Sequence, residues 1–179
     1  MAGGLGIGLR MAAKKRSNKR GSIQDLIFIV VVLVFFGVTV LIGFKIGNEF
    51  NTQIQANSAI PAEAKAASTS LVANFPGVLD NVFLFFAIGL AMVSLILAAL
   101  VRVHPIFVPL FIIAWVIVLF ISGVASNIYQ ELAASPHLAA EAAQLTLISN
   151  VLEYLPLFIG VLGTLLMIVL YKIGGEAIQ

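Results

Sequence analysis

Long uncharged stretches of apolar residues alternate along the chain with shorter polar segments. Four of these stretches contain about 18 residues or more, a length that crosses the ~30 Å hydrocarbon core of a bilayer as an α-helix. They cover residues 26–44, 82–101, 106–125 and 154–171. Backbone groups in lipid must satisfy their own hydrogen bonds, and the runs lack the polar–apolar alternation of barrel strands. The pattern therefore predicts four transmembrane helices.

The first polar segment between the runs, residues 45–81, is rich in Ala, Ser, Asn and Gln. Its beginning predicts an extension of the first helix to about Ala59, which Pro61 interrupts. Residues 62–75 then have a helix-forming composition, and the Pro76-Gly77 pair is expected to end that helix.

The second polar segment, residues 126–153, follows a similar plan. Pro136 follows an extension of the third run, and residues 137–150 are predicted to form a helix with apolar residues on one stripe. A weak internal repeat of two helical hairpins follows from this likeness, although any two transmembrane hairpins share such a plan. The stripe consists of Leu138, Ala142, Leu145 and Ile148.

The predicted fold class is all-α: a four-transmembrane-helix bundle of two helical hairpins, with short helical external segments. Residues 1–22 form a basic, glycine-containing N-terminal arm, and residues 23–179 form the membrane domain. The basic residues before the first run resemble the start of a secretory signal. However, the 19 uncharged residues of the first run exceed the apolar core of a usual signal, which has about 7–15 residues, and no cleavage site follows the run closely. We therefore expect an uncleaved signal anchor.

Composition supports a membrane protein. The 179 residues are 61% apolar and 10% charged, with a mean hydropathy of +1.11, whereas soluble domains carry about 25% charged residues. These values exclude a soluble enzyme, a disordered chain and a disulfide scaffold. The chain has no cysteine, which also excludes a thiol nucleophile and a cysteine-bound zinc ion.

Charge predicts the orientation of the spans. Eight of the ten basic residues fall on one side, whereas Lys45, Lys65 and six of the eight acidic residues fall on the other. Cytoplasmic segments carry the excess of Lys and Arg, so both termini are predicted to be cytoplasmic. The eight basic residues on the cytoplasmic side are expected to contact anionic headgroups or a partner. They are Arg10, Lys14, Lys15, Arg16, Lys19, Arg20, Arg102 and Lys172.

None of the four runs contains an ionisable residue in its core. Such residues inside a membrane usually mark transport or proton relay, so their absence argues against a proton-coupled transporter or pump. A pore remains open as an alternative, because hydroxyl groups occur in the runs at Thr39, Ser94, Ser122 and Thr164. Single hydroxyls in a span usually bond to their own helix.

No catalytic, cofactor or metal site is expected. His104 is interpreted as an interfacial turn residue, and His137 has only Glu141 near it, whereas a metal needs three or four ligands. The glycines at the start of the chain follow no predicted strand and precede no Gly-Lys-Ser/Thr sequence, so a phosphate-binding loop is not predicted.

Small residues at helical spacing predict close helix packing, either within the chain or with another copy of it. They form one stripe on the second run and three small-xxx-small pairs. The stripe is Ala87, Ala91, Ser94 and Ala98, and the pairs are Gly43 with Gly47, Ser122 with Ser126, and Gly160 with Thr164.

Two features of the chain carry a resemblance to a known family of proteins. They are the arm from Gly3 to Arg20 and the tight turn Arg102-Val103-His104-Pro105 between two apolar runs. In this general plan the chain resembles small virion membrane proteins of tailless icosahedral viruses with an internal membrane. The resemblance implies a structural role between the bilayer and a capsid shell, and it carries over no functional residues.

The leading hypothesis is a structural protein that packs as an oligomer and tethers a membrane to a capsid or other assembly through its arm. A small pore-forming, holin-like protein and an accessory subunit of a host membrane complex are the alternatives. Within the arm, the basic residues suit anionic lipid, nucleic acid or an acidic protein surface. Nucleic acid is not favoured, because no aromatic residue is interleaved for base stacking.

The predicted topology can be tested with single cysteines, because the chain has none of its own. Cysteine in place of Ser68 or His137 should react with an impermeant thiol reagent from the external side. Cysteine in place of Asn18 or Ala177 should react only from the cytoplasmic side. Cytoplasmic labelling at positions 68 and 137 would contradict this orientation.

Overall fold

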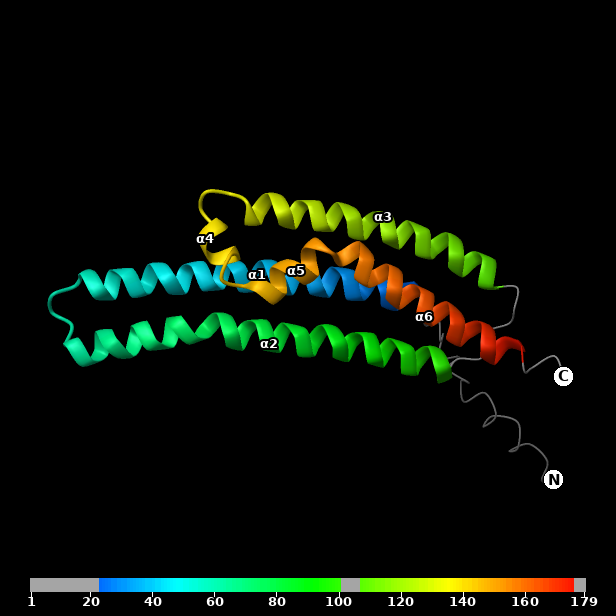
Figure 1. The fold of residues 1–179 in the computed structure, drawn as a ribbon, viewed down its shortest axis with the longest axis horizontal. Coiled ribbons are helices and arrows are strands. Elements are labelled where there is room, and N and C mark those ends of the chain that lie inside the picture. The colour runs from blue at the N-terminus through cyan, green and yellow to red at the C-terminus, as the bar shows by residue number, and fades with distance from the viewer. Residues whose placement is uncertain (1–22, 101–106, 176–179) are drawn as a thin grey trace, which may run out of the picture.

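The computed structural model describes residues 23–100 and 107–175, which contain helices and no strand. The N-terminal arm and the turn from Arg102 to Pro105 lie outside the described residues. The elements are α1 (Ile23–Ala56), α2 (Ala62–Leu100), α3 (Phe107–Ala133), α4 (Ala139–Ala142), α5 (Thr146–Glu153) and α6 (Leu155–Gly175) (Figure 1).

The helices confirm a multi-pass, all-α membrane protein. Helices α1, α2 and α3 are each long and apolar enough to cross a bilayer, and α5 with α6 makes a fourth candidate span that is bent by 67°. Apart from Tyr154, which lies between α5 and α6, the described parts of the four predicted runs fall within α1, α2, α3 and α6. Pro109 and Pro156 lie in the first turns of α3 and α6, where a missing N–H removes no helical hydrogen bond.

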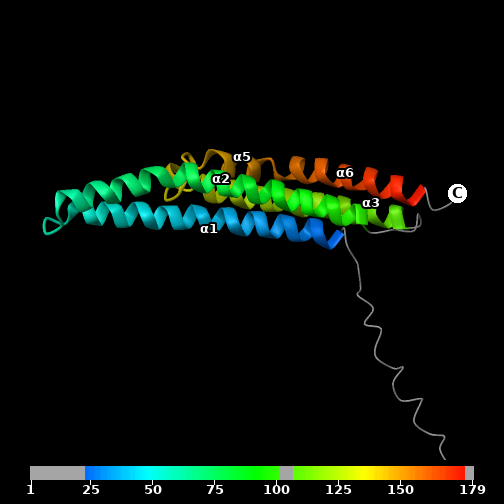
Figure 2. The ribbon, with the colours of Figure 1, turned by 90° about the horizontal axis from the view of Figure 1, so that it is seen from below.

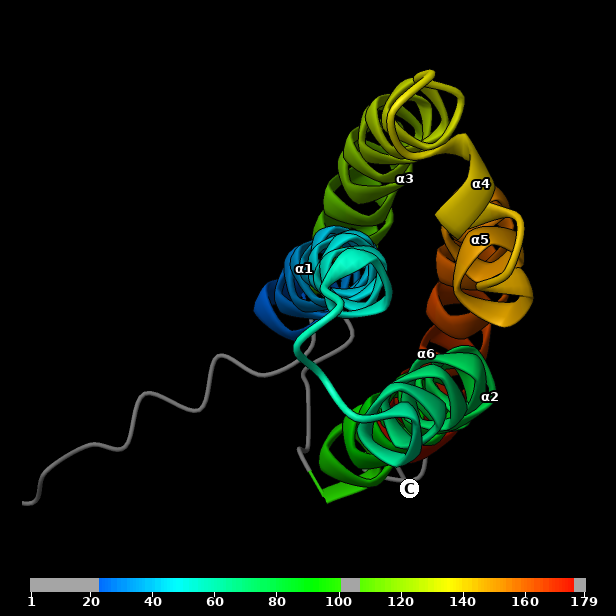
Figure 3. The ribbon, with the colours of Figure 1, turned by 90° about the vertical axis from the view of Figure 1, so that its left-hand side faces the viewer.

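The four long helices form a ring, which Figure 3 shows along their axes. Helix α1 packs on α2, α2 on α6, α6 on α3, and α3 on α1. The buried face of α1 recurs every three or four residues, as helical geometry requires. It consists of Leu26, Ile29, Val30, Leu33, Leu41 and Phe44.

Helices α1 and α2 form an antiparallel hairpin that extends beyond the other helices (Figures 1 and 2). With 34 and 39 residues they are about 51 and 58 Å long, well above the ~30 Å of the hydrocarbon core. Near the tip, Gln55 and Lys65 join the two helices: Gln55 Nε2 donates to the Lys65 carbonyl at 3.0 Å, and Lys65 Nζ donates to the Gln55 carbonyl at 2.9 Å.

The prediction that Pro76-Gly77 ends a helix is wrong, because α2 continues through this pair. Proline removes one hydrogen bond and favours a bend, but it does not stop a helix whose flanking turns pack well. On one side Phe75 lies against Gly47 of α1, with 3.9 Å between the ring and a Cβ built on that glycine. On the other side Asp80 and Phe83 are buried.

The prediction of one helix over residues 137–150 is also wrong. The segment forms α4 and α5, separated by the turn at Ala143–Leu145. The apolar stripe nevertheless faces the protein: Ala142, Leu145 and Ile148 are buried and Leu138 is half-buried. The two polar segments therefore differ, one forming a long hairpin of continuous helices and the other two short helices, which argues against the internal repeat.

Two glycines admit large side chains from neighbouring helices. A Cβ on Gly37 of α1 would overlap the Leu152 side chain of α5 and come within 3.3 Å of Ile148. A Cβ on Gly163 of α6 would overlap the indole ring of Trp115 of α3. Both glycines let helices approach closely, as small residues do in membrane proteins.

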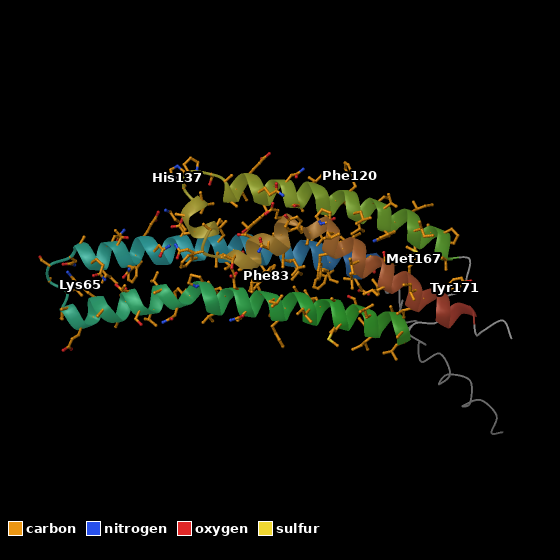
Figure 4. The ribbon with its side chains drawn as sticks, in the orientation of Figure 1. Lys65, Phe83, Phe120, His137, Met167 and Tyr171 are labelled. Carbon is orange, nitrogen blue, oxygen red and sulfur yellow. The ribbon has the colours of Figure 1, made fainter. Side chains whose placement is uncertain are left out.

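Large apolar side chains also cover the outer surface of the ring. Phe120 lies on the outer face of α3 and is 75% exposed, whereas Phe83 lies fully buried among the helices (Figure 4). Phe35 of α1 and Phe85 of α2 are similarly exposed. Such a surface suits lipid rather than water, in agreement with the span assignment.

The fit at Gly163 predicts that Gly163→Ala destabilises the protein by about 1–3 kcal/mol, since the added methyl group must displace a rigid ring. The matched control is Gly43→Ala, because Gly43 is exposed and a Cβ there meets nothing within 4 Å. Unfolding of both variants in lipid nanodiscs would measure the difference. Equal stability of the two variants would contradict this account of the α3–α6 contact.

Candidate functional site

Polar side chains from five helices gather at the level of α4 and α5, next to the base of the projecting hairpin. We call this set the polar layer. It lies where the uncharged run of α1 ends and that of α2 begins, and so at one edge of the predicted membrane region. Its members are Lys45, Asn48, Asp80, Ser126, Tyr129, Glu141, Thr146 and Ser149.

The buried carboxylate of Asp80 caps the N-terminus of α5. Asp80 Oδ2 accepts from the backbone N–H of Leu147 at 3.0 Å, and Oδ1 accepts from that of Ile148 at 3.1 Å. The Thr146 hydroxyl also donates to Oδ2 at 3.3 Å. Leu145, at the N-cap of α5, makes no side-chain cap bond. Asp80 therefore performs for α5 the task of an N-cap residue, although it belongs to α2.

A chain of hydroxyl groups joins α3 to α4 and α5. The Ser149 hydroxyl donates to the carbonyl of Ala142 at 3.0 Å, and it also lies 3.0 Å from the Tyr129 hydroxyl. Since the only Ser149 hydroxyl proton goes to Ala142, Tyr129 must be the donor in the second bond. Tyr129 is 1% exposed, so this bond satisfies a polar group that water does not reach.

The C-terminus of α5 is also held by α3. The Ser126 hydroxyl donates to the carbonyl of Glu153 at 2.6 Å, which satisfies one of the acceptors that a helix end leaves open. On its apolar side, α5 places Ile148 and Leu152 against Gly37 of α1. Contacts with α1, α2 and α3 thus fix α5, and with it the 67° bend to α6.

Glu141 of α4 is the second buried carboxylate of the layer. Its Oε1 lies 3.5 Å from Lys45 Nζ and accepts from Asn48 Nδ2 at 3.4 Å, so α4 is tied to α1. Lys45 Nζ also lies 3.5 Å from the exposed carboxylate of Glu49, one turn along α1. The other oxygen, Glu141 Oε2, is buried and has no hydrogen-bond partner among the described residues.

An open groove of about 500 Å³ runs between α3 and α6. Trp115 and Thr164 provide the only polar side-chain groups of its lining, and both are already bonded to α6. Trp115 Nε1 donates to the Ile159 carbonyl at 3.4 Å, and the Thr164 hydroxyl donates to the Gly160 carbonyl at 2.8 Å. The groove therefore has room for an acyl chain of a lipid, but its described lining has no free polar group that could bind a polar ligand.

The residues predicted to pack helices divide into two groups. Ala87, Ser94, Ala98, Ser122 and Ser126 are buried, and Ala91, Gly47 and Gly160 are half-buried. In contrast, Gly43 and Thr164 are exposed.

Of the eight basic residues predicted to contact lipid or a partner, one belongs to a described helix. Lys172 lies on α6. The other seven lie outside the described residues: Arg10, Lys14, Lys15, Arg16, Lys19, Arg20 and Arg102.

Sequence reasoning missed the residues that organise the layer. The sequence predicts only that Asp80, Glu141 and Lys45 are external charges next to the spans, because nothing local distinguishes a solvated carboxylate from one that caps a distant helix. The absence of a capping side chain at Leu145 becomes meaningful only once the structure shows that α5 begins there, so no local signal marks Asp80 as the cap.

The side chains of the polar layer join one helix to another. No three His, Cys, Asp or Glu side chains within residues 23–100 and 107–175 are grouped so as to hold a metal ion. Comparisons with protein-family models, with curated proteins and with solved structures found no match to this chain. The geometry therefore carries the functional argument.

Asp80→Asn should destabilise the protein by about 1–2 kcal/mol, because the α5 cap loses its charge and one acceptor oxygen. Amide hydrogen exchange should accelerate at Leu147 and Ile148 in particular. The exposed Glu131 of α3 provides a matched control, and Glu131→Gln should leave both measurements unchanged. If exchange at these two amides were unaffected by Asp80→Asn, the capping role would be refuted.

Proposed function

We propose that this chain is a structural integral membrane protein that packs as an oligomer and tethers a membrane to a protein shell or similar assembly. The observation that carries the proposal is the use of the polar layer. Its buried side chains join α1 to α4, α2 to α5, and α3 to α5. Polar groups committed to contacts between helices maintain a shape, and this is what a scaffold requires.

The alternative of a pore is supported less well. Thr39 and Thr164 are exposed on the outer surface, whereas Ser94 and Ser122 are buried. Ser122 also donates to the Leu119 carbonyl of its own helix at 2.8 Å. The four hydroxyl groups therefore do not line a common path within one copy of the chain, and a pore would have to form between copies.

The two ends of the molecule suit a protein that acts on both sides of a membrane. The N-terminus of α1, to which the arm is joined, lies at the opposite end from the hairpin tip (Figures 1 and 2). With both termini in the cytoplasm, the arm would meet partners on that side and the hairpin would stand on the other.

Charge defines the partner that the arm would bind. Five basic residues fall within the seven positions 14–20, a density that suits anionic headgroups or an acidic protein surface. The resemblance to virion membrane proteins favours a capsid protein as that surface and the internal membrane of a virion as the location. We propose this tether as the main role of the arm.

Deleting residues 2–20 should weaken retention of the protein in its particle or complex, and raised salt should do the same to the full chain. Exposed charges attract over only about 8 Å at physiological ionic strength, so added salt screens them further. Membrane insertion should survive, because the first span is intact. Co-sedimentation over a range of salt concentrations would measure retention, and equal assembly of both chains at every concentration would exclude the tether.

A further inference from the structure

One oxygen of the buried Glu141 carboxylate makes no hydrogen bond within the part of the chain that the structure describes. Glu141 is 5% exposed, and its Oε2 has no hydrogen-bond partner among the described residues. A buried carboxylate oxygen without a partner carries a large desolvation cost, so such oxygens are nearly always satisfied in folded proteins. This oxygen therefore indicates a bound group that donates to it or coordinates it.

The neighbouring donors are already engaged. Lys45 Nζ and Asn48 Nδ2 both approach the other oxygen, Glu141 Oε1. The hydroxyl protons of Ser149 and Tyr129 are used within the chain that ends at the Ala142 carbonyl. Because Oε2 is also shielded from the surface, a side chain of another protein cannot reach it, and the occupant must be small.

The charges of the layer favour a cation over a neutral molecule. Asp80 and Glu141 are both buried, and the backbone amides of α5 offset the charge of Asp80 alone. Within the described residues, Lys45 Nζ contacts both Glu141 Oε1 and the exposed carboxylate of Glu49, so its charge is divided between the two. Glu141 Oε2 is buried and accepts no hydrogen bond from this ammonium group, and uncompensated charge is costly next to an apolar region.

We propose that Glu141 Oε2 anchors a partly dehydrated monovalent cation of the sodium type. Hard cations take oxygen ligands, which a carboxylate supplies. A divalent ion is disfavoured for two reasons. The ammonium group of Lys45 lies beside the site, and Glu141 belongs to no group of three acidic, histidine or cysteine side chains within the described ranges. The proposal does not depend on the structural role proposed above.

The full chain in nanodiscs provides the test, through thermal unfolding at constant ionic strength in sodium or in N-methyl-D-glucamine chloride. Sodium at ten times its dissociation constant should raise the unfolding midpoint by about 3–6 °C. Glu141→Gln should abolish the difference between the two salts. The matched control Glu49→Gln removes an exposed carboxylate from the same lysine and should retain the difference.

A second measurement uses only the wild-type protein, so it tests the proposal even where the Glu141→Gln variant does not fold. Sodium-23 relaxation in the presence of the wild-type protein should reveal bound sodium that lithium displaces. Identical unfolding midpoints in the two salts, with no bound sodium in the relaxation data, would overturn the proposal and indicate a buried water molecule. An equal loss of the sodium effect in Glu49→Gln would also overturn it, by assigning the effect to the exposed ion pair.

Discussion

The bond from the Asp80 carboxylate to the first turn of α5 is the constraint on which the end of the molecule at the polar layer depends. A helix that breaks at a membrane edge leaves backbone groups open, and each must find a partner inside the protein. Asp80 supplies two acceptors at one end of α5, and the Ser126 hydroxyl supplies a donor at the other. The 67° bend between α5 and α6 is stable because both ends of α5 are satisfied in this way.

The spans themselves are held by shape more than by polarity. Lipid is as apolar as the interior, so burial of an apolar side chain between helices gains little over its exposure to lipid. Close fit becomes the deciding factor, and the structure achieves it at Gly37 against Leu152 and at Gly163 against Trp115. The first contact links the spans to the polar layer, because Leu152 belongs to the helix that Asp80 caps.

These two systems together make a four-helix body from which the α1–α2 hairpin extends. The ring of four helices is apolar inside and outside, the polar layer closes it at one edge, and the α1–α2 hairpin continues beyond (Figure 1). Lys45 and Glu141 fix α4 to the base of that hairpin. A protein built in this way suits the scaffold role that we propose, in which the basic arm would make a charged contact on the other side of the membrane.

The sequence by itself determined the number of apolar runs, the all-helical class and the first-turn positions of Pro109 and Pro156, because hydrophobic length and local backbone preference reside in neighbouring residues. Only the tertiary structure decided that α2 continues through Pro76, that the 137–150 segment breaks, and that Gly37 and Gly163 rather than Gly43 make the closest contacts. Asp80 accepts hydrogen bonds from two residues that are 67 and 68 positions further along the chain, and Asn48 donates to Glu141 over a separation of 93 positions. Contacts over such separations depend on how the helices are arranged in space, and no local pattern of residues encodes that arrangement.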